Sequence, residues 1–282
     1  MTTINCKEIA ANIRKGLGEK VSSLTEKYGE KPFLEIVQVG AHPSSVSYVK
    51  SIERTCDNMG VNHRLSIYDE NISEEELVKV IETLNSDDSV HGVIIQYPLP
   101  QHLDQDRIAN TLSPDKDVDC VNSTNLGKLF MGVKGIVPCT PKGMMRILEE
   151  SGVDLVGKEV VVVGNGRTVG KPISQLLLHS GATVTVCHVQ TKDLKKHVKE
   201  ADVVICAAGK AGLVTGDMVK DGVVVVDAAI NVIGDKIVGD ADFEEVSKKA
   251  SLITPVPGGV GTTTNAMLIE NLLELFVSHK EK

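Results

Sequence analysis

The sequence predicts an α/β protein with two domains, each a mainly parallel sheet with flanking helices, the second being Rossmann-like and doubly wound. Three observations support this prediction. The 282 residues are too many for one typical core and suit two domains of roughly 100 to 150 residues each. Strand-like apolar runs alternate with amphipathic segments in both halves, and a glycine-rich turn follows the first strand of the second half. We place the domains at residues 1–144 and 145–264.

The first domain is predicted to hold three strands separated by two helices. The strands are the apolar runs at 32–40, 63–69 and 90–100. The helices begin near Ser44 and near Ser73, and Glu76 completes a capping-box pattern with Ser73. A βαβαβ order needs crossover connections, so we expect a parallel sheet.

The second domain is predicted to contain four buried strands. They are nearly continuous runs of Val, Ile and Ala, typical of a sheet covered on both faces, at 158–166, 182–188, 202–209 and 222–230. The last segment, 265–280, has apolar residues at helical spacing and is expected to be a helix.

Composition narrows the classes of partner. The net charge of −8, with acids and bases interspersed, argues against nucleic acid, since phosphate binding needs a basic face. No stretch of about 18 apolar residues could span a bilayer, and the first residues lack the apolar core of a signal peptide. The six cysteines form no CxxC pair, so we expect free thiols, no metal site and a cytoplasmic location. A small-molecule partner is expected.

A glycine turn marks the start of the second domain. Gly164, Gly166 and Gly170 lie where the first strand ends and a helix begins, so backbone N–H groups and the helix N-terminus could hold a pyrophosphate. The spacing is GxGxxxG, and such a turn can also serve tight packing alone. Its position in a βαβ unit favours dinucleotide binding. The acid that usually binds the ribose is missing, because the second strand ends in CHVQTKD.

The segment SYVKSIERTCDNMG, residues 47–60, is expected to be a helix with one uncharged face. At about 100° per residue, that face carries Tyr48, Ile52, Thr55, Cys56 and Met59. Lys50 and Arg54 fall on the opposite face. The uncharged face must meet either the core or a ligand.

Four loops carry further polar or glycine-rich motifs, namely QYPLP (96–100), KDVDC (116–120), CTPKG (139–143) and TPVPGGVGTTT (254–264). Each follows a predicted strand or connects elements, at the edge where open α/β sheets bind ligands. The bare backbone of PVPGGVG suits the close approach of a flat ring, although a turn without a ligand explains it equally well. For Gln96 and Asp119, a hydrogen bond that stabilises the loop is the simpler interpretation.

Together these motifs resemble the methylenetetrahydrofolate dehydrogenase/cyclohydrolase family of the FolD type, over essentially the whole chain. The motifs that carry the resemblance are PSSVSYV, HGVIIQYPLPQH, PDKDVD, CTPKG, VVGNGRTVGKP, TVTVCH and ITPVPGGVG. The resemblance implies a folate-binding catalytic domain joined by the C-terminal helix 265–282, an NAD(P)-binding second domain, and a homodimer. It implies oxidation of 5,10-methylenetetrahydrofolate to the methenyl form by hydride transfer, which most members follow by hydrolysis to 10-formyltetrahydrofolate.

The resemblance also assigns roles on the folate side. Tyr48 matches the tyrosine that stacks on the folate rings, Gln96 the glutamine beside the reacting carbon, and Asp119 the aspartate that binds the polar edge of the pterin. A carboxylate that accepts two N–H bonds is sound chemistry for that edge. Pro257, Gly258 and Gly259 match the glycine-rich substrate loop. The uncharged face of helix 47–60 is therefore expected to be a pocket wall.

One departure from the family concerns its principal catalytic group. The family pattern is Tyr-x-x-x-Lys, and the lysine position is Ile52. An isoleucine can neither transfer a proton nor activate water. Lys50 and Arg54 lie about 160° away around the helix and cannot replace it. Hydride transfer depends mainly on positioning, so we expect the dehydrogenase to survive and the cyclohydrolase to be weak or absent.

Other departures lie near the cofactor, whose expected contacts are Gly164, Asn165, Gly166, Val189 and Ile230. The family usually has an arginine at the glycine turn and a serine or arginine after the second strand, where this chain has Asn165 and Val189. Loss of donors to a 2′-phosphate favours NAD slightly over NADP. Arg167 and Lys192 keep NADP as an alternative. Thr262, Thr263 and Cys120 also depart from the family pattern.

Three hypotheses follow. The first is an NAD(P)-dependent methylenetetrahydrofolate dehydrogenase with weak or absent cyclohydrolase activity. The second is a bifunctional enzyme in which another group replaces the lysine. The third is a folate- or nucleotide-binding paralogue without catalysis. Retention of Tyr48, Gln96 and Asp119 favours an enzyme.

Overall fold

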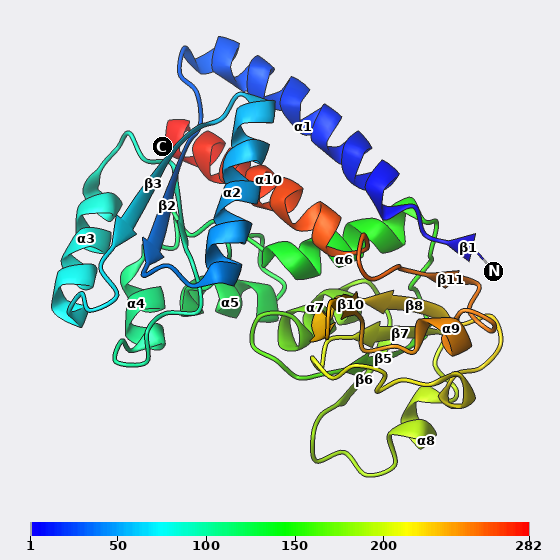
Figure 1. Ribbon diagram of the computed structural model, residues 1–282. Helices are drawn as coiled ribbons and strands as arrows, with labels where there is room; N and C mark the ends of the chain where they lie inside the picture. Colours follow the sequence, from blue (N-terminus) through cyan, green and yellow to red (C-terminus); the bar gives the residue numbers. More distant parts are fainter. Residues whose placement is uncertain (1, 282) are drawn as a thin grey trace. The chain divides into compact units, whose positions relative to one another are not determined.

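The computed structural model describes residues 2–281, and the chain divides into two compact units. The three-stranded unit comprises Ile13–Cys139 and the residues from Asn265 onward. The six-stranded unit comprises the residues up to Asn12 together with Thr140–Thr264. Each unit is an α/β structure with a parallel sheet, as predicted (Figure 1).

The sheet of the three-stranded unit has the order β3–β2–β4. Its strands are β2 (Phe33–Val39), β3 (Asn62–Tyr68) and β4 (Gly92–Ile95). All pairings are parallel, and Leu34 in the central strand pairs with His63 on one side and Gly92 on the other. The three predicted strands and their βαβαβ order are therefore confirmed.

Helices surround this sheet. They are α1 (Cys6–Tyr28), which begins in the other unit, α2 (Pro43–Met59), α3 (Glu74–Ser86), α4 (Gln105–Thr111), α5 (Ser123–Phe130) and α10 (Gly261–Lys280). The capping box of α3 forms as predicted, with Ser73 and Glu76 each accepting from the other's backbone N–H. Helix α10 runs beside α2, and Asn265 Nδ2 donates to Ser51 Oγ at 2.8 Å (Figure 1).

The sheet of the six-stranded unit has the order β1–β11–β8–β7–β5–β6. Its strands are β1 (Thr2–Thr3), β5 (Glu159–Val163), β6 (Thr183–Cys187), β7 (Val203–Cys206), β8 (Val224–Asp227) and β11 (Leu252–Ile253). The helical segments are α6 (Cys139–Glu150), α7 (Gly170–His179), α8 (Leu194–Val198), η1 (Gly216–Met218) and α9 (Phe243–Val246). A separate hairpin pairs β9 (Asn231–Ile233) with β10 (Lys236–Val238).

The four predicted strands of this unit are β5 to β8, and the sheet continues beyond them through β11 and β1. Thr2 pairs with Leu252, which explains why the residues up to Asn12 group with this unit, although the sequence placed residues 1–144 in the first domain. Two-residue strands carry no detectable periodicity. Strand order reverses at β5, which has β6 on one side and β7 on the other. Ligands of doubly wound sheets bind beyond the carboxyl ends of the strands at such a reversal.

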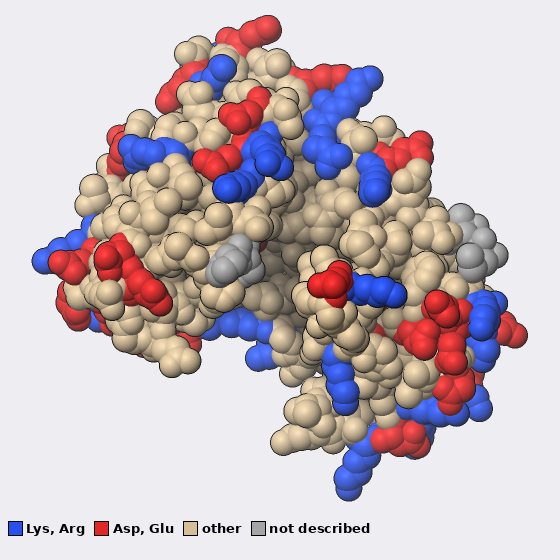
Figure 2. Space-filling view, in the orientation of Figure 1, with Lys and Arg blue, Asp and Glu red and all other residues tan. Residues whose placement is uncertain are grey.

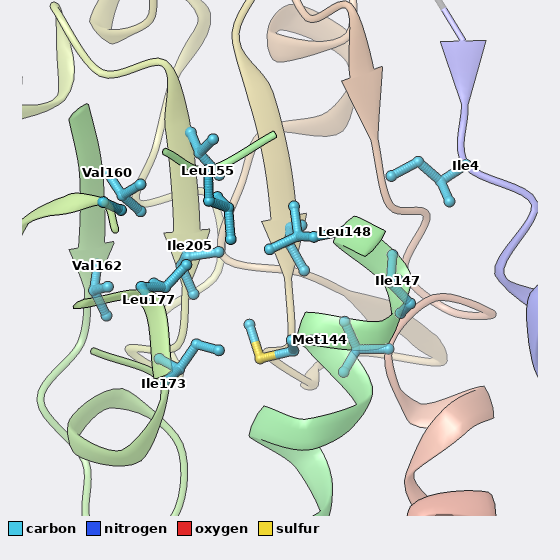
Figure 3. Packing of buried hydrophobic residues seen from close by; sticks show 14 of the residues in the cluster. Ile4, Met144, Ile147, Leu148, Leu155, Val160, Val162, Ile173, Leu177 and Ile205 are labelled. Carbon is cyan, nitrogen blue, oxygen red and sulfur yellow. The ribbon is translucent and has the colours of Figure 1, made fainter. Parts of the chain in front are cut away.

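A continuous apolar core fills one face of this sheet. Figure 3 shows Val160, Val162 and Ile205 of the strands facing Ile173 and Leu177 of α7. Met144, Ile147 and Leu148 of α6 complete the cluster, and all eight side chains are buried. This packing fixes the positions of β5 and β7, and with them the carboxyl ends of the two strands.

The surface carries both charge signs. Acidic and basic side chains are interspersed over the face seen in Figure 2, in agreement with the net charge of −8. Among residues 2–281, no helix is long and apolar enough to cross a membrane. All six cysteines are free and buried.

Candidate functional site

The face of α2 predicted to be uncharged points into the three-stranded unit. Ile52 and Cys56 are fully buried, and Tyr48 is half-buried. Lys50 and Arg54 lie on the opposite face, where Lys50 is exposed. The helix therefore presents a phenol and an apolar wall, and its two basic side chains point away from them.

Asp117 organises the loop that carries Asp119. Asp117 is fully buried and accepts N–H bonds from Val121 at 3.0 Å and from Asn122 at 2.9 Å. Its second oxygen also accepts from Asn125 Nδ2 at 3.0 Å. These bonds fix the loop between α4 and α5, so the backbone that carries Asp119 is held in place. The sequence does not reveal this role, because the partners of Asp117 belong to a loop without periodicity.

Asp119 and Tyr48 come within electrostatic range of each other. Burial raises the pKa of the Asp119 carboxyl to about 6, and the nearby Asp117 charge adds to that rise. Burial also raises the pKa of the Tyr48 phenol, with a further contribution from the Asp119 charge. Cys139, the first residue of α6, donates its N–H to Asp119 Oδ1 at 3.4 Å and so anchors the carboxylate, although the sequence predicted a loop there. The two residues predicted to bind folate therefore lie in one neighbourhood.

Asn271 of α10 braces the same neighbourhood. It is fully buried, and its Nδ2 donates at 2.8 Å to the carbonyls of both Val118 and Val137. One amide thus ties the backbone beside Asp119 to the segment that leads into Cys139. The terminal helix contributes to this site as a brace.

Gln96 follows β4 directly, at the carboxyl end of a strand. Its backbone N–H donates to Val37 O at 2.8 Å, which keeps it in register with the sheet. Its Nε2 donates to Tyr97 O at 2.7 Å. The buried Oε1 has no hydrogen-bond partner within residues 2–281. A buried acceptor without a donor is costly, so Gln96 is suited to accept a bond from a ligand.

Ile52 supplies no polar group to the neighbourhood of Tyr48 and Asp119. Ile52 is fully buried and contributes only hydrocarbon beside the Tyr48 position. The sequence predicted a departure from the family pattern here, and the side chain is enclosed in the helix face that carries Tyr48. Proton transfer at this site must involve a group other than residue 52.

In the six-stranded unit, the glycine turn after β5 is tightly packed at two of its three glycines. A Cβ at Gly164, whose φ is +127°, would lie 2.2 Å from Ala207 O. A Cβ at Gly170, where α7 begins, would lie 2.1 Å from Gly164 O. A Cβ at Gly166 would meet no atom of the described residues within 4 Å, and Asn165 beside it is exposed. The turn is thus packed against the protein at Gly164 and Gly170 and accessible at Gly166, as a binding site for a pyrophosphate requires.

The side chains expected near the cofactor ribose and ring point outward. Val189, after β6, is 100% exposed and Ile230, after β8, is 68% exposed. No acid follows β6 directly to hold ribose hydroxyls, since the chain continues HVQTK. Both positions are therefore accessible to a ligand, and neither supplies a charge.

A small cavity of about 160 Å³ brings together residues predicted from two distant loops. The segment 227–230 forms one wall, and the other wall includes Pro257, Gly258 and Gly259. A Cβ at Gly259 would lie 2.2 Å from Pro255 O, so this glycine is required by the turn itself. Ile230 and the glycine-rich loop, assigned separately from the sequence, therefore line one cavity.

Two buried carboxylates hold the loops around this edge of the sheet. Asp227 accepts N–H bonds from Ala229 at 2.9 Å and Ala241 at 2.8 Å. Burial raises the pKa of Asp227 to about 6, and the charge of Asp240 contributes to the rise. Asp240 accepts three N–H bonds from the loop after β7. Neither role could be predicted from the sequence, because the residues around each aspartate give no sign of the segments that it binds.

A parallel sheet that reverses its strand order beside an open glycine turn defines a Rossmann-type dinucleotide-binding protein. The comparisons with known proteins identify the particular family. The model of the tetrahydrofolate dehydrogenase/cyclohydrolase catalytic domain matches residues 4–119, and the model of its NAD(P)-binding domain matches residues 138–280. The chain belongs to the tetrahydrofolate dehydrogenase/cyclohydrolase family.

Individual relatives agree over nearly the full length. The bifunctional protein FolD of Caldanaerobacter subterraneus is 47% identical, with 97% of this chain and 96% of that protein covered. A crystal structure of the bifunctional enzyme FolD from Campylobacter jejuni has a TM-score of 0.97 at 46% identity and covers 99% of each chain. The Trypanosoma brucei dehydrogenase–cyclohydrolase, solved with NADP and an inhibitor, has a TM-score of 0.95 at 35% identity, covering 100% of this chain and 99% of that one.

Proposed function

We propose that this protein oxidises 5,10-methylenetetrahydrofolate to the methenyl form by hydride transfer to NAD(P). The observation that carries the proposal is the neighbourhood of Tyr48, on the uncharged face of α2, and Asp119, whose loop is held by Asp117 and Asn271. A stacking phenol, a buried carboxylate and the unpaired acceptor of Gln96 match the ring, the N–H edge and the polar groups of a reduced pterin.

The six-stranded unit supports the cofactor half of the proposal. The open backbone at Gly166 and the start of α7 suit a pyrophosphate, and Ile230 lines the same cavity as the substrate loop Pro257–Gly259, which suits the approach of a flat ring. When bound, the nicotinamide accepts the hydride. The contribution of this chain is to position the cofactor, since these residues supply backbone and hydrocarbon and no group for proton transfer.

The hydrolytic step is the second candidate activity. Two of the relatives named above are called bifunctional, which favours the alternative in which cyclohydrolase activity persists over the weak or absent activity expected from the sequence. Ile52 favours the absence of cyclohydrolase activity, because it is fully buried and carries no proton that it could transfer. Any hydrolysis must therefore use a group at another position.

One assay tests both activities. Wild-type protein is mixed with methylenetetrahydrofolate and either NAD or NADP, and the absorbances of reduced cofactor and of the methenyl compound are followed together. Reduction with neither cofactor would contradict the dehydrogenase and leave the non-catalytic binder. Decay of the methenyl signal faster than in enzyme-free buffer would demonstrate the cyclohydrolase, and decay at the buffer rate would support its absence.

Ile52→Lys is the matched variant for the second step. It restores the family's side chain at that position, and we expect faster methenyl decay with little change in cofactor reduction. Ile52→Leu keeps the position apolar and serves as the control. A wild-type protein that already hydrolyses rapidly, and an Ile52→Lys variant that adds nothing, would show that another residue has taken over the lysine's role.

Two finer features complete the proposal. We propose a preference for NAD, because the exposed Val189 and Asn165 provide no cation for a 2′-phosphate. We also propose a homodimer in the cytoplasm, in line with the family resemblance and the free buried thiols. Kinetic constants for the two cofactors test the first feature, and sedimentation velocity tests the dimer.

A further inference from the structure

The loop after β7 is held by a single buried carboxylate. Asp240 is fully buried and lies outside the regular elements, after β10. Its Oδ2 accepts from Ala208 N–H at 2.6 Å and from Gly209 N–H at 2.9 Å. Its Oδ1 accepts from Lys210 N–H at 2.6 Å and from Asn231 Nδ2 at 2.9 Å. Both oxygens are thus satisfied by donors from two other segments.

This loop occupies the place where the sheet reverses its strand order. Its strand, β7, lies next to β5, and the reversal point is where doubly wound sheets bind dinucleotides. The loop also touches the glycine turn itself, because a Cβ at Gly164 would lie 2.2 Å from Ala207 O. Any shift of 207–210 would therefore move the backbone against which Gly164 is packed.

The loop has few other means of holding its shape. Ala208, Gly209 and Lys210 are exposed residues, and Gly209 adopts a φ of +67°. Successive N–H groups of an exposed loop are normally satisfied by water. Here a buried carboxylate takes three of them, and charge-assisted bonds of this kind are about twice as strong as neutral ones.

We propose that Asp240 is a positioning residue for the dinucleotide site, which it serves by fixing the 208–210 loop against the glycine turn. The inference rests on the proposed function of this unit. Asp240 itself is fully buried and both of its oxygens accept from protein donors, so its effect passes through the backbone of the loop. Loss of the carboxylate is expected to weaken cofactor binding and to leave folate binding unchanged.

The first test needs no variant. Amide hydrogen exchange of the wild-type protein should show the N–H groups of Ala208, Gly209 and Lys210 to be strongly protected, although these residues are exposed. Exchange at the rates of an unstructured loop would overturn the proposal directly.

The second test compares Asp240→Asn with Asp242→Asn. Both remove one negative charge from the same segment, but the carboxylate of Asp242 caps α9 by accepting from Glu245 N–H. In Asp240→Asn we expect faster exchange at 208–210 and a rise of about tenfold in the Kd for the dinucleotide, with the folate KM unchanged. Asp242→Asn should leave exchange and Kd as in the wild type.

Asn231→Ala covers the case in which Asp240→Asn does not fold. It removes one of the four donors without changing charge, so the same two measurements should shift in the same direction by a smaller factor. Unchanged exchange and Kd in Asn231→Ala and Asp240→Asn, or equal losses of cofactor and folate affinity, would overturn the positioning role.

The outcomes separate this inference from the function on which it rests. A wild type that binds dinucleotide but does not oxidise the folate would remove the proposed reaction and leave Asp240 in its role. A wild type that turns over normally while its loop amides exchange freely would leave the proposed reaction and remove the role of Asp240. A wild type that binds neither NAD nor NADP would overturn both.

Discussion

The proposed function has a dinucleotide half in the six-stranded unit and a folate half in the three-stranded unit, and the two halves are built from different kinds of groups. In the six-stranded unit the site is built from backbone: the glycine turn is open at Gly166, Asp240 holds the loop at 208–210, and the exposed Val189 and Ile230 supply no charge. In the three-stranded unit the site is side chains, each fixed by a neighbour, as Asp119 is by Cys139. The first half should tolerate most replacements except at its glycines. In the second half, a single replacement changes which reactions the side chains can support, as isoleucine does at position 52, where the family has lysine.

Gly164→Ala should have the largest effect on the backbone-built half. The new Cβ would lie 2.2 Å from Ala207 O at a φ of +127°, so the turn must move, and we expect a loss of about 3 kcal/mol in the free energy of unfolding. Dinucleotide binding should be lost with it. Urea denaturation and calorimetric titration with NAD measure the two effects.

Gly166→Ala is the matched control, because its Cβ would meet nothing within 4 Å among residues 2–281. Its stability should equal that of the wild type, and only its affinity for the dinucleotide should fall, since the methyl group would stand where the pyrophosphate approaches. Normal affinity in Gly166→Ala would mean that the turn serves packing alone.

Asp119→Ala tests the half that is built from side chains. Removing the carboxylate leaves N–H donors of the pterin unpaired, so folate binding should weaken by roughly 1 to 3 kcal/mol while NAD binding is unchanged. Asp88→Ala, which removes an exposed carboxylate from the same unit, is the control. Folate affinity equal to the wild type, measured by fluorescence titration, would exclude Asp119 from the site.

One side chain of the three-stranded unit, His91, is also expected to make its stability depend on pH. Burial lowers the pKa of His91 to about 4, and its Nδ1 accepts from Phe33 N–H at 3.1 Å. The unfolded chain therefore binds the proton more readily than the folded one, and stability is lost as the pH falls below about 6.5. Between about pH 6.5 and pH 5 this group should contribute a loss of about 2 kcal/mol.

His91→Gln should remove that part of the acid sensitivity, because glutamine can still accept the Phe33 N–H bond without titrating. Denaturant midpoints at several pH values measure the difference in slope. His197→Gln, at an exposed position of α8, should retain the wild-type slope. A His91→Gln variant with the wild-type slope would place the acid sensitivity elsewhere.

Asn165→Arg should have the smallest effect and tests whether side chains matter at all in the backbone-built half. Asn165 is exposed at the glycine turn, and a planar donor fork there should shift preference toward NADP by about 1 kcal/mol. The ratio of kcat/KM for the two cofactors measures the shift. Asn165→Gln is the uncharged control, and a wild type that already prefers NADP strongly would contradict the proposed role of Asn165 and Val189.

The features that could be predicted from the sequence are those with a local signal. The Ser73–Glu76 capping box, the runs that became β5 to β8, and the orientation of Ile52 all follow from neighbours in the chain. The two-residue strands β1 and β11 were missed because they are stable only within the sheet. Their pairing also decides where the residues up to Asn12 belong.

The braces of the site were also missed, for a related reason. Asp117, Asp240 and Asn271 have no distinctive spacing, and the farthest partner, that of Asn271, lies 153 residues away. A buried carboxylate in a loop looks the same in sequence as a solvated one. The residues proposed to face the ligand could be carried over from family motifs, whereas the residues that hold them depend on contacts visible only in the structure.

The six buried thiols are distributed so that their reactivity can report local opening in each unit. Three buried cysteines belong to the six-stranded unit (Cys6, Cys187 and Cys206) and three to the three-stranded unit (Cys56, Cys120 and Cys139). A buried thiol reacts with an alkylating reagent only when its surroundings open, so the labelling rate of each cysteine measures the free energy of that opening. Mass spectrometry of partly labelled protein then reads the two units separately. Labelling of all six together would show a single cooperative transition, and two groups of three would show that each unit unfolds as its own domain.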